Sequence, residues 1–317
     1  GICMRWDMHG IGSFREPTNT YHTALFMCRL YGLQASHPTR VACELLDSQN
    51  ALINQSRQDA RGLSNLHGWG IGHKTEGDMV CARQVDPASE SSSYRTQALH
   101  TKSRMVMAHI RRATVGQPKQ FNTHPFRHER ALLIHNGHIP SFDKIRPHLL
   151  EYLDPGRRTT IQGETDSEHI LALLLQLRAE APRDTLRSVT REAVRRVQAW
   201  VDAEAPDGTA EATLDDTDAL SHDELKRVLG LNLIWTDGHA VSGARFNRSL
   251  WTLQRDQVPI CAICHQKHAH PPDGVAYQST TLASERLTDE AWSEVPNGSV
   301  FHIQPNGSPD FSSPTAW

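Results

Sequence analysis

The sequence predicts a layered α/β protein whose strands pair mainly in the antiparallel sense. Three observations support the prediction. Strand-like segments occur up to about residue 135, two helical segments lie between residues 165 and 200, and a hairpin signal with further strands follows residue 230. Strands, then helices, then strands again are typical of a fold in which helices cover antiparallel sheets.

The first predicted elements are a strand from Cys28 to Leu33 and a helical stretch from Cys43 to Ile53. A turn-rich region then leads to residues 67–72, His-Gly-Trp-Gly-Ile-Gly. We reject a dinucleotide-binding loop here, because such a loop needs a helix after it and strand-like residues follow instead. We expect these glycines to let a strand pass close to another backbone or to a ligand.

Two more strands are predicted in the middle of the chain. Residues 105–111 alternate so that Val106, Ala108 and Ile110 share one face, and residues 131–135 form a second apolar run. Each run ends in polar residues, so polar side chains are expected at strand ends.

A capping box of Thr165 and Glu168 opens the first predicted helix and puts Asp166 at a helix N-terminus. A second helix is predicted from about residue 185 to 200. The acidic, small residues of 201–221 are expected to form a solvated insertion that need not be ordered and carries no chemistry.

The last elements are strands. Residues 231–236 and 239–245, joined by Asp237-Gly238, form the clearest hairpin signal in the chain. Another strand pair is expected from Ser249 onward.

Composition favours small-molecule chemistry. The chain has 317 residues, 38% of them hydrophobic, a net charge of −3 and an isoelectric point near 6.7, so neither nucleic acid nor an anionic membrane is an expected partner. No window approaches the roughly 18 apolar residues of a membrane span. Six cysteines are too sparse for a disulfide scaffold, and no secretory signal is recognisable, so we expect a cytoplasmic protein.

Residues 1–27 mix Gly, Pro, His and Thr without periodicity and are expected to lie outside the domain, which is assigned to residues 28–317. Two interpretations are open: a propeptide cleaved before Cys28, or upstream sequence read from a misassigned start with Met27 as the true initiator. The second is favoured.

Cys28 is the most informative residue because it follows Met27 directly. Once that methionine is removed, one residue carries a thiol with a pKa near 8.5 and a free α-amine with a pKa of about 7.7–8, and the amine can accept the thiol proton. A lone cysteine in an apolar strand is more often a core residue, so the assignment depends on the rest of the chain.

Four separated segments share complementary polar groups at the ends of elements. These are Cys28, residues 109–116 (His-Ile-Arg-Arg-Ala-Thr-Val-Gly), residues 122–125 with 135–137, and residues 163–166 (Gly-Glu-Thr-Asp). Together they resemble the class II glutamine amidotransferases, which are N-terminal-nucleophile (Ntn) hydrolases. The resemblance implies a four-layer αββα sandwich with mainly antiparallel sheets, and it is strong over residues 28–177.

The resemblance also implies roles for seven residues and no metal or cofactor in the reaction. Cys28 is the nucleophile, Asn136 and Gly137 form the oxyanion hole, and Arg111, Thr114, His124 and Asp166 bind the substrate. A zwitterionic amino acid needs a cation and an anion, which Arg111 and Asp166 supply. An amide and a backbone N–H can stabilise the oxyanion of thioester formation.

Each of these residues alone has a simpler interpretation. Asn136-Gly137 would be a hairpin turn, Asp166 a favourable charge at a helix start, and Arg111 with Arg112 a solvated pair of charges. Their joint occurrence with the Met-Cys pair favours the enzyme.

Details of the motifs bear on the substrate. Arg112 and Val115 stand where sugar-phosphate synthases of the family often have Trp and His, so the chain looks closer to small stand-alone members. Some of those hydrolyse γ-glutamyl amides in glutathione degradation or ergothioneine synthesis. His67 stands where they often carry Asp.

The expected activity is therefore hydrolysis of the γ-amide of glutamine through a Cys28 thioester, giving glutamate and ammonia. A partner protein would supply the ammonia acceptor or a peptidase activity. The alternative is a γ-glutamyl peptide or γ-glutamyl amide hydrolase. A rival of another class is a zinc-stabilised binding module with an inert Cys28.

Cys261 and Cys264 form a Cys-x-x-Cys pair followed by His265, His268 and His270. Such a pair is half a zinc site, which the histidines could complete. Because the spacing is cramped, a reduced pair in a surface loop is favoured over a structural metal.

Overall fold

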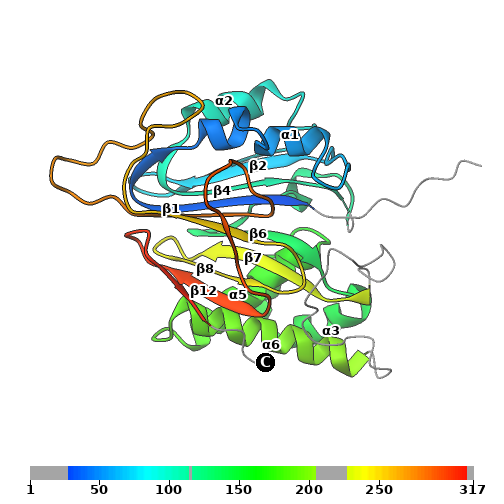
Figure 1. Cartoon of the computed structure of the whole chain (residues 1–317). Helices are drawn as coiled ribbons and strands as arrows, with labels where there is room; N and C mark the ends of the chain where they lie inside the picture. Colours follow the sequence, from blue (N-terminus) through cyan, green and yellow to red (C-terminus); the bar gives the residue numbers. More distant parts are fainter. Residues whose placement is uncertain (1–27, 114–115, 205–226, 313–317) are drawn as a thin grey trace, which may run out of the picture.

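A computed structural model of the chain describes residues 28–113, 116–204 and 227–312. Its strands form a seven-stranded sheet in the order β11-β9-β10-β1-β4-β2-β3 and a six-stranded sheet in the order β13-β12-β8-β7-β6-β5 (Figure 1). Every described pair is antiparallel. The strands are β1 (Arg29–Arg40), β2 (Trp69–Lys74), β3 (Met79–Gln84), β4 (Lys102–Ile110), β5 (Phe126–His128), β6 (Ala131–His138), β7 (Gly230–Thr236), β8 (Val241–Arg245), β9 (Trp251–Arg255), β10 (Ser279–Ala283), β11 (Ser293–Glu294), β12 (Ser299–Ile303) and β13 (Pro309–Phe311).

Helices cover the outer face of each sheet. Figure 1 shows α1 and α2 over the seven-stranded sheet and α3, α5 and α6 over the six-stranded one, with the two sheets face to face between them. The helical elements are η1, a π-helical turn (Cys43–Asp47), α1 (Leu52–Arg57), α2 (Ser92–His100), η2, a 3₁₀ turn (Gln120–Asn122), α3 (Phe142–Tyr152), α4 (Pro155–Arg158), α5 (Asp166–Glu180) and α6 (Leu186–Glu204). The four-layer αββα sandwich expected from the resemblance is confirmed.

Three apolar cores hold the layers together. One lies between the sheets and includes Leu30, Met107 and Ile134. A second joins the seven-stranded sheet to η1, α1 and α2, and a third joins the six-stranded sheet to α3, α5 and α6. Because both sheets are covered on both faces, a pocket can form where their strands end.

Strand register brings the N-terminal end of β1 beside the C-terminal end of β4. Arg29 pairs with Ile110, so Cys28 lies beside Arg111 and Arg112, which follow β4. Strand β2 flanks β4 on its other side, with Trp69 opposite Ile110. Segments separated by about 80 residues therefore meet at the same end of the seven-stranded sheet.

The glycines of β2 serve a close backbone approach, as predicted. A Cβ atom at Gly70 would lie 2.1 Å from the carbonyl oxygen of His124, and one at Gly72 would lie 2.6 Å from Leu132 Cδ1. Glycine at these positions lets the segment containing the cis peptide bond His124–Pro125 pack directly on β2.

The predicted bounds of two helical segments are corrected. The helical stretch over residues 43–53 is divided into η1 and α1, because the chain becomes extended at Ser48. Helix α6 runs to Glu204, four residues into the predicted insertion, because Val201 is buried in the core beside the six-stranded sheet. The remainder of that segment and residues 1–27 lie outside the described residues.

Candidate active site

Cys28 lies immediately before β1 and is half-buried. Its Sγ accepts a hydrogen bond from the Arg112 backbone N–H at 3.3 Å and lies 3.4 Å from the Arg112 carbonyl oxygen. Burial raises the pKa of the Cys28 thiol, and the Arg112 N–H and the charges of Arg111 and Arg29 oppose that rise. The thiol therefore needs a base to become a nucleophile at neutral pH.

A buried ionic network holds the start of β1. The Arg29 guanidinium lies 2.7 Å from Asp59 and 2.6 Å from Glu285, and its Nη1 donates to the Cys28 carbonyl at 3.1 Å. Sequence reasoning missed this network, because its carboxylates come from segments without a motif.

Cys28 opens into a small pocket together with residues from four other segments. The cavity has a volume of about 20 Å³, room for about one water molecule, so a glutamine-sized ligand requires neighbouring side chains to move. The pocket is lined by Cys28, Arg111, Arg112, His124, His135, Gly137, Thr165, Asp166 and Ser167. Five predicted site residues are thus brought together, namely Cys28, Arg111, His124, Gly137 and Asp166.

Arg111 is held at the end of β4 by backbone groups. Its guanidinium donates to the carbonyl oxygens of Gly116 at 3.1 Å and Gln117 at 3.3 Å. Nearby, His67 Nδ1 accepts from the Ala113 N–H at 2.9 Å, and burial together with Arg111 and Arg112 lowers the pKa of His67. A neutral His67 can therefore fix the loop after β4. The predicted binding residue Thr114 lies outside the described residues.

Asn136 and Gly137 lie within β6, paired with β7, and do not form a turn. Asn136 is fully buried, and neither its Nδ2 nor its Oδ1 has a hydrogen-bond partner among the described residues. A Cβ atom at Gly137 would lie 2.0 Å from the Gly230 carbonyl oxygen. An unpaired buried amide costs free energy, so its retention points to a ligand that completes it.

Three histidines pack beside the pocket. His109 and His124 stack with ring centroids 4.0 Å apart, and His109 Nε2 donates to the His135 carbonyl oxygen at 3.1 Å, bridging the two sheets. Neither ring nitrogen of His124 has a partner among the described residues. Burial lowers the pKa of all three, that of His109 to about 3, so the rings are neutral at physiological pH.

Asp166 is the first residue of α5, and Thr165 is the N-cap, as predicted; the Thr165 side chain accepts from the Glu168 N–H. The Asp166 carboxylate accepts from the Ile139 N–H at 2.9 Å and from the Ser167 N–H at 2.8 Å. These bonds leave acceptor capacity facing the pocket, because a carboxylate offers about four lone-pair sites.

The four-layer sandwich, with a cysteine before its central strand, is a fold of the Ntn-hydrolase type. The chain belongs to the class-II glutamine amidotransferases, since the model of that family matches residues 27–259. It is therefore an enzyme, and the interpretation as an inert binding module was wrong.

The chain is similar to known proteins with two kinds of name. The chain is 28% identical over 307 residues to a probable glutamine amidotransferase, DUG3, of Saccharomyces cerevisiae, across 88% of this chain and 82% of that protein. It is 33% identical over 115 residues to a γ-glutamyl-hercynylcysteine sulfoxide hydrolase of Mycobacterium tuberculosis, across 35% of this chain and 49% of that protein.

The solved structures support the fold. A glutamine aminotransferase class-II domain protein from Silicibacter pomeroyi superposes with a TM-score of 0.55 at 16% identity, across 90% of this chain and 98% of that one.

None of the helices in the described part of the chain combines the length and apolar composition that crossing a bilayer requires.

Proposed function

We propose that this enzyme hydrolyses a γ-glutamyl amide bond through a thioester on Cys28. The observation that carries the proposal is the gathering of a thiol, a guanidinium, a carboxylate and the Gly137 backbone in one pocket. The unpaired amide of Asn136 lies next to Gly137 along β6.

Substrate recognition depends on two opposite charges. Arg111 binds the α-carboxylate of the γ-glutamyl group, and Asp166 binds its α-ammonium. His124, neutral and without a partner among the described residues, contributes a further hydrogen bond in the pocket. Because both charged contacts recognise the amino acid end, the group beyond the amide nitrogen is free to vary.

The chemistry proceeds in two displacements. The Cys28 α-amine takes the thiol proton, Sγ attacks the amide carbon, and the oxyanion is stabilised by Asn136 Nδ2–H and the Gly137 N–H. The C–N bond then breaks as the departing nitrogen takes the proton from the α-ammonium. Water hydrolyses the thioester, releasing glutamate and restoring the thiol.

This mechanism requires a free Cys28 amine, because an amide nitrogen is not a base. The start of the family match at residue 27 supports a mature enzyme that begins at Cys28. The burial that raises the thiol pKa makes a base on the same residue more important.

Two substrate classes carry the γ-glutamyl group that these contacts would recognise. Free glutamine would give ammonia, for which a partner protein would supply the acceptor. The similarity to a γ-glutamyl-hercynylcysteine sulfoxide hydrolase favours the second class, a γ-glutamyl peptide or amide whose cleavage releases a larger amine.

The experiment compares glutamate release from glutamine, from γ-glutamyl dipeptides and from glutathione by a chain that begins at Cys28. Cys28→Ala should abolish turnover without unfolding the protein, and the control Cys81→Ala, which changes a half-buried thiol on β3, should keep it. Full activity of Cys28→Ala, or of a chain verified by mass spectrometry to retain residues 1–27, would refute the mechanism.

A further inference from the structure

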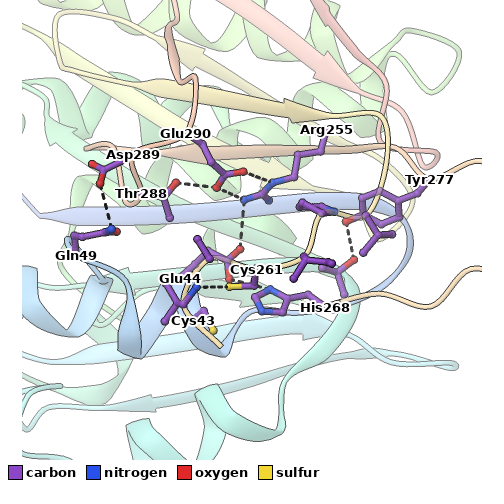
Figure 2. Close-up of a pocket in the computed structure, with 16 residues that line it drawn as sticks. Cys43, Glu44, Gln49, Arg255, Cys261, His268, Tyr277, Thr288, Asp289 and Glu290 are labelled. Carbon is purple, nitrogen blue, oxygen red and sulfur yellow. Dashed lines mark hydrogen bonds and ion pairs between the residues drawn. The ribbon is translucent and has the colours of Figure 1, made fainter. Parts of the chain in front are cut away.

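A second cluster of reactive side chains lies away from the active site. Cys43 on η1 meets Cys261, Cys264 and His268 from residues 256–278, the loop between β9 and β10, and their ligand atoms all lie within 4.8 Å of one another. Figure 2 shows Cys43, Cys261 and His268 turned toward one another at one side of a pocket. The volume of this pocket is about 360 Å³.

The turn that begins at Cys261 presents the sulfurs of Cys261 and Cys264 to the same cluster. The Ile263 N–H donates to Cys261 Sγ at 3.4 Å, and the His265 N–H donates to the Cys261 carbonyl at 2.9 Å. An antiparallel bridge between Ile260 and Lys267 closes this turn, in which His265 adopts a φ of 57°. These two bonds hold Cys261 and Cys264 in one tight turn, so that both sulfurs can contact a single ion.

His268 has the orientation of a metal ligand. Its Nε2 lies 3.2 Å from Cys264 Sγ, and its Nδ1 lies 3.8 Å from Glu44 Oε2. Glu44 is buried, and its Oε2 has no hydrogen bond among the described residues. A histidine that ligates a metal commonly donates its second ring N–H to a carboxylate, and a small movement of Glu44 or His268 would form that bond.

The loop that carries three of these side chains has little core of its own. Between Asp256 and Gln278 only Ala269 and Tyr277 are buried, and the loop contains no helix and no strand beyond the single bridge between Ile260 and Lys267. A loop of this length needs another source of order. A bond from the loop to Cys43 would tie it to the helical layer.

We propose that Cys43, Cys261, Cys264 and His268 bind one structural zinc ion. Three thiolates and one imidazole match the Cys₃His set of closed tetrahedral zinc sites, and ligands near 2.3 Å from the metal put sulfurs about 3.8 Å apart, a small contraction from the present cluster. Binding releases three thiol protons and leaves a site of net charge −1. Four protein ligands leave no position for a reacting water, so the ion stabilises the loop and takes no part in catalysis.

This proposal replaces the reduced surface pair expected from the sequence. The Cys-x-x-Cys spacing is cramped only when the following histidines must supply both remaining ligands. Here Cys43, from a distant segment, supplies the third ligand, and no local sequence pattern predicts its part in the cluster.

The first test measures zinc in the chain that begins at Cys28, after reconstitution with equimolar zinc and gel filtration. We expect one zinc per chain in the wild type and a loss of at least tenfold in affinity for Cys264→Ser and for His268→Gln. The matched controls Cys81→Ser and His265→Gln, which change the same residue types outside the cluster, should bind as the wild type does. Absence of bound zinc in the wild type, or wild-type affinity in Cys264→Ser, would overturn the proposal.

Cobalt provides a readout independent of folding yield. Co²⁺ in the wild type should give the intense visible bands of tetrahedral coordination together with thiolate charge-transfer absorption, and Cys264→Ser should weaken the charge-transfer absorption.

Glu44→Gln should lower zinc affinity about 10–100-fold and leave the cobalt spectrum unchanged. A disulfide among the three cysteines in protein purified without oxidant, or octahedral cobalt spectra, would contradict the site. Cys28→Ala should bind zinc normally, which separates this test from the proposed hydrolysis.

Discussion

In the candidate site, some buried polar side chains have hydrogen-bond partners and others have none among the described residues. Arg29, Arg111 and Asp166 are buried and bonded to groups of the protein itself, whereas the amide of Asn136 and the ring of His124 have no partner among the described residues. Unpaired buried groups lower stability, and they persist where function requires them.

This contrast gives opposite expectations for activity and stability at Asn136. Asn136→Ala should lower kcat by about 10²–10³ because an oxyanion donor is lost. The same change should leave the midpoint of thermal unfolding equal or higher, because it removes an unpaired polar group. Steady-state kinetics and calorimetry test both expectations.

The control is Asn232→Ala on the neighbouring strand β7. Its amide bonds the Ser249 carbonyl and the Phe246 N–H, so its loss should lower stability. An Asn136 variant that behaves like this control, destabilised and with unchanged kcat, would contradict the oxyanion assignment.

Individual site residues were predictable where a motif carried them. Cys28, Gly137 and Asp166 were found from their motifs, and the structure places them at one pocket. The ion pairs of Arg29 with Asp59 and Glu285 were not found, because a pair formed by distant segments has no local pattern in a single sequence.

At the scale of elements, the helix starting at Asp166 shows how a cap positions a functional group. Thr165 accepts the Glu168 N–H, and Glu168 reaches back to the Gln162 and Gly163 N–H groups. The carboxylate of Asp166 therefore lies on a rigid helix end that also faces the pocket.

The cap of α5 should matter for both stability and substrate binding. Thr165→Ala should lower the free energy of unfolding by about 1 kcal/mol and raise KM, because the helix end that carries Asp166 loosens. Denaturant unfolding and kinetics measure the two effects. Ser91→Ala, which removes the corresponding cap of α2 at the Tyr94 N–H, should match the stability loss with no change in KM. Equal KM values in the two variants would contradict the positioning role.

Elements were predictable from the sequence where a local signal was strong. The Asp237-Gly238 hairpin formed as β7 and β8, and the glycine adopts a φ of 93°. Helix α2 was missed because only Tyr94 and Ala98 are buried on it, which gives no apolar stripe. Strand β1 continues past Leu33 to Arg40 through an irregularity after Gln34, which accommodates Pro38.

At the scale of the whole molecule, the interface between the sheets contains ionisable side chains. His109, on the seven-stranded sheet, bonds the backbone of His135 on the six-stranded sheet, next to His124. The strand order that produces this arrangement could not be derived from the sequence. The alternation of apolar and polar residues predicts where strands lie, but it does not predict which strands pair.

Acid should destabilise the fold through these histidines. Their pKa values are lowered in the folded protein and return to about 6.5 on unfolding, so the unfolded chain binds more protons below that pH. The free energy of unfolding should therefore fall as the pH drops from 7 to 5.5, by at most about 1.4 kcal/mol per pH unit for each histidine. Urea unfolding at both pH values measures this, and His124→Gln should reduce the dependence. A free energy of unfolding that is equal at the two pH values would contradict it.

Strand β1 is bonded on both sides, to β10 and to β4. Its amides should accordingly be among the slowest to exchange with deuterated solvent, while the edge strands β3, β5, β11 and β13 fray first. Local opening of the edge strands therefore leaves β1, and with it the position of Cys28, unchanged. The molecule can open locally at its edges without disturbing the candidate active site.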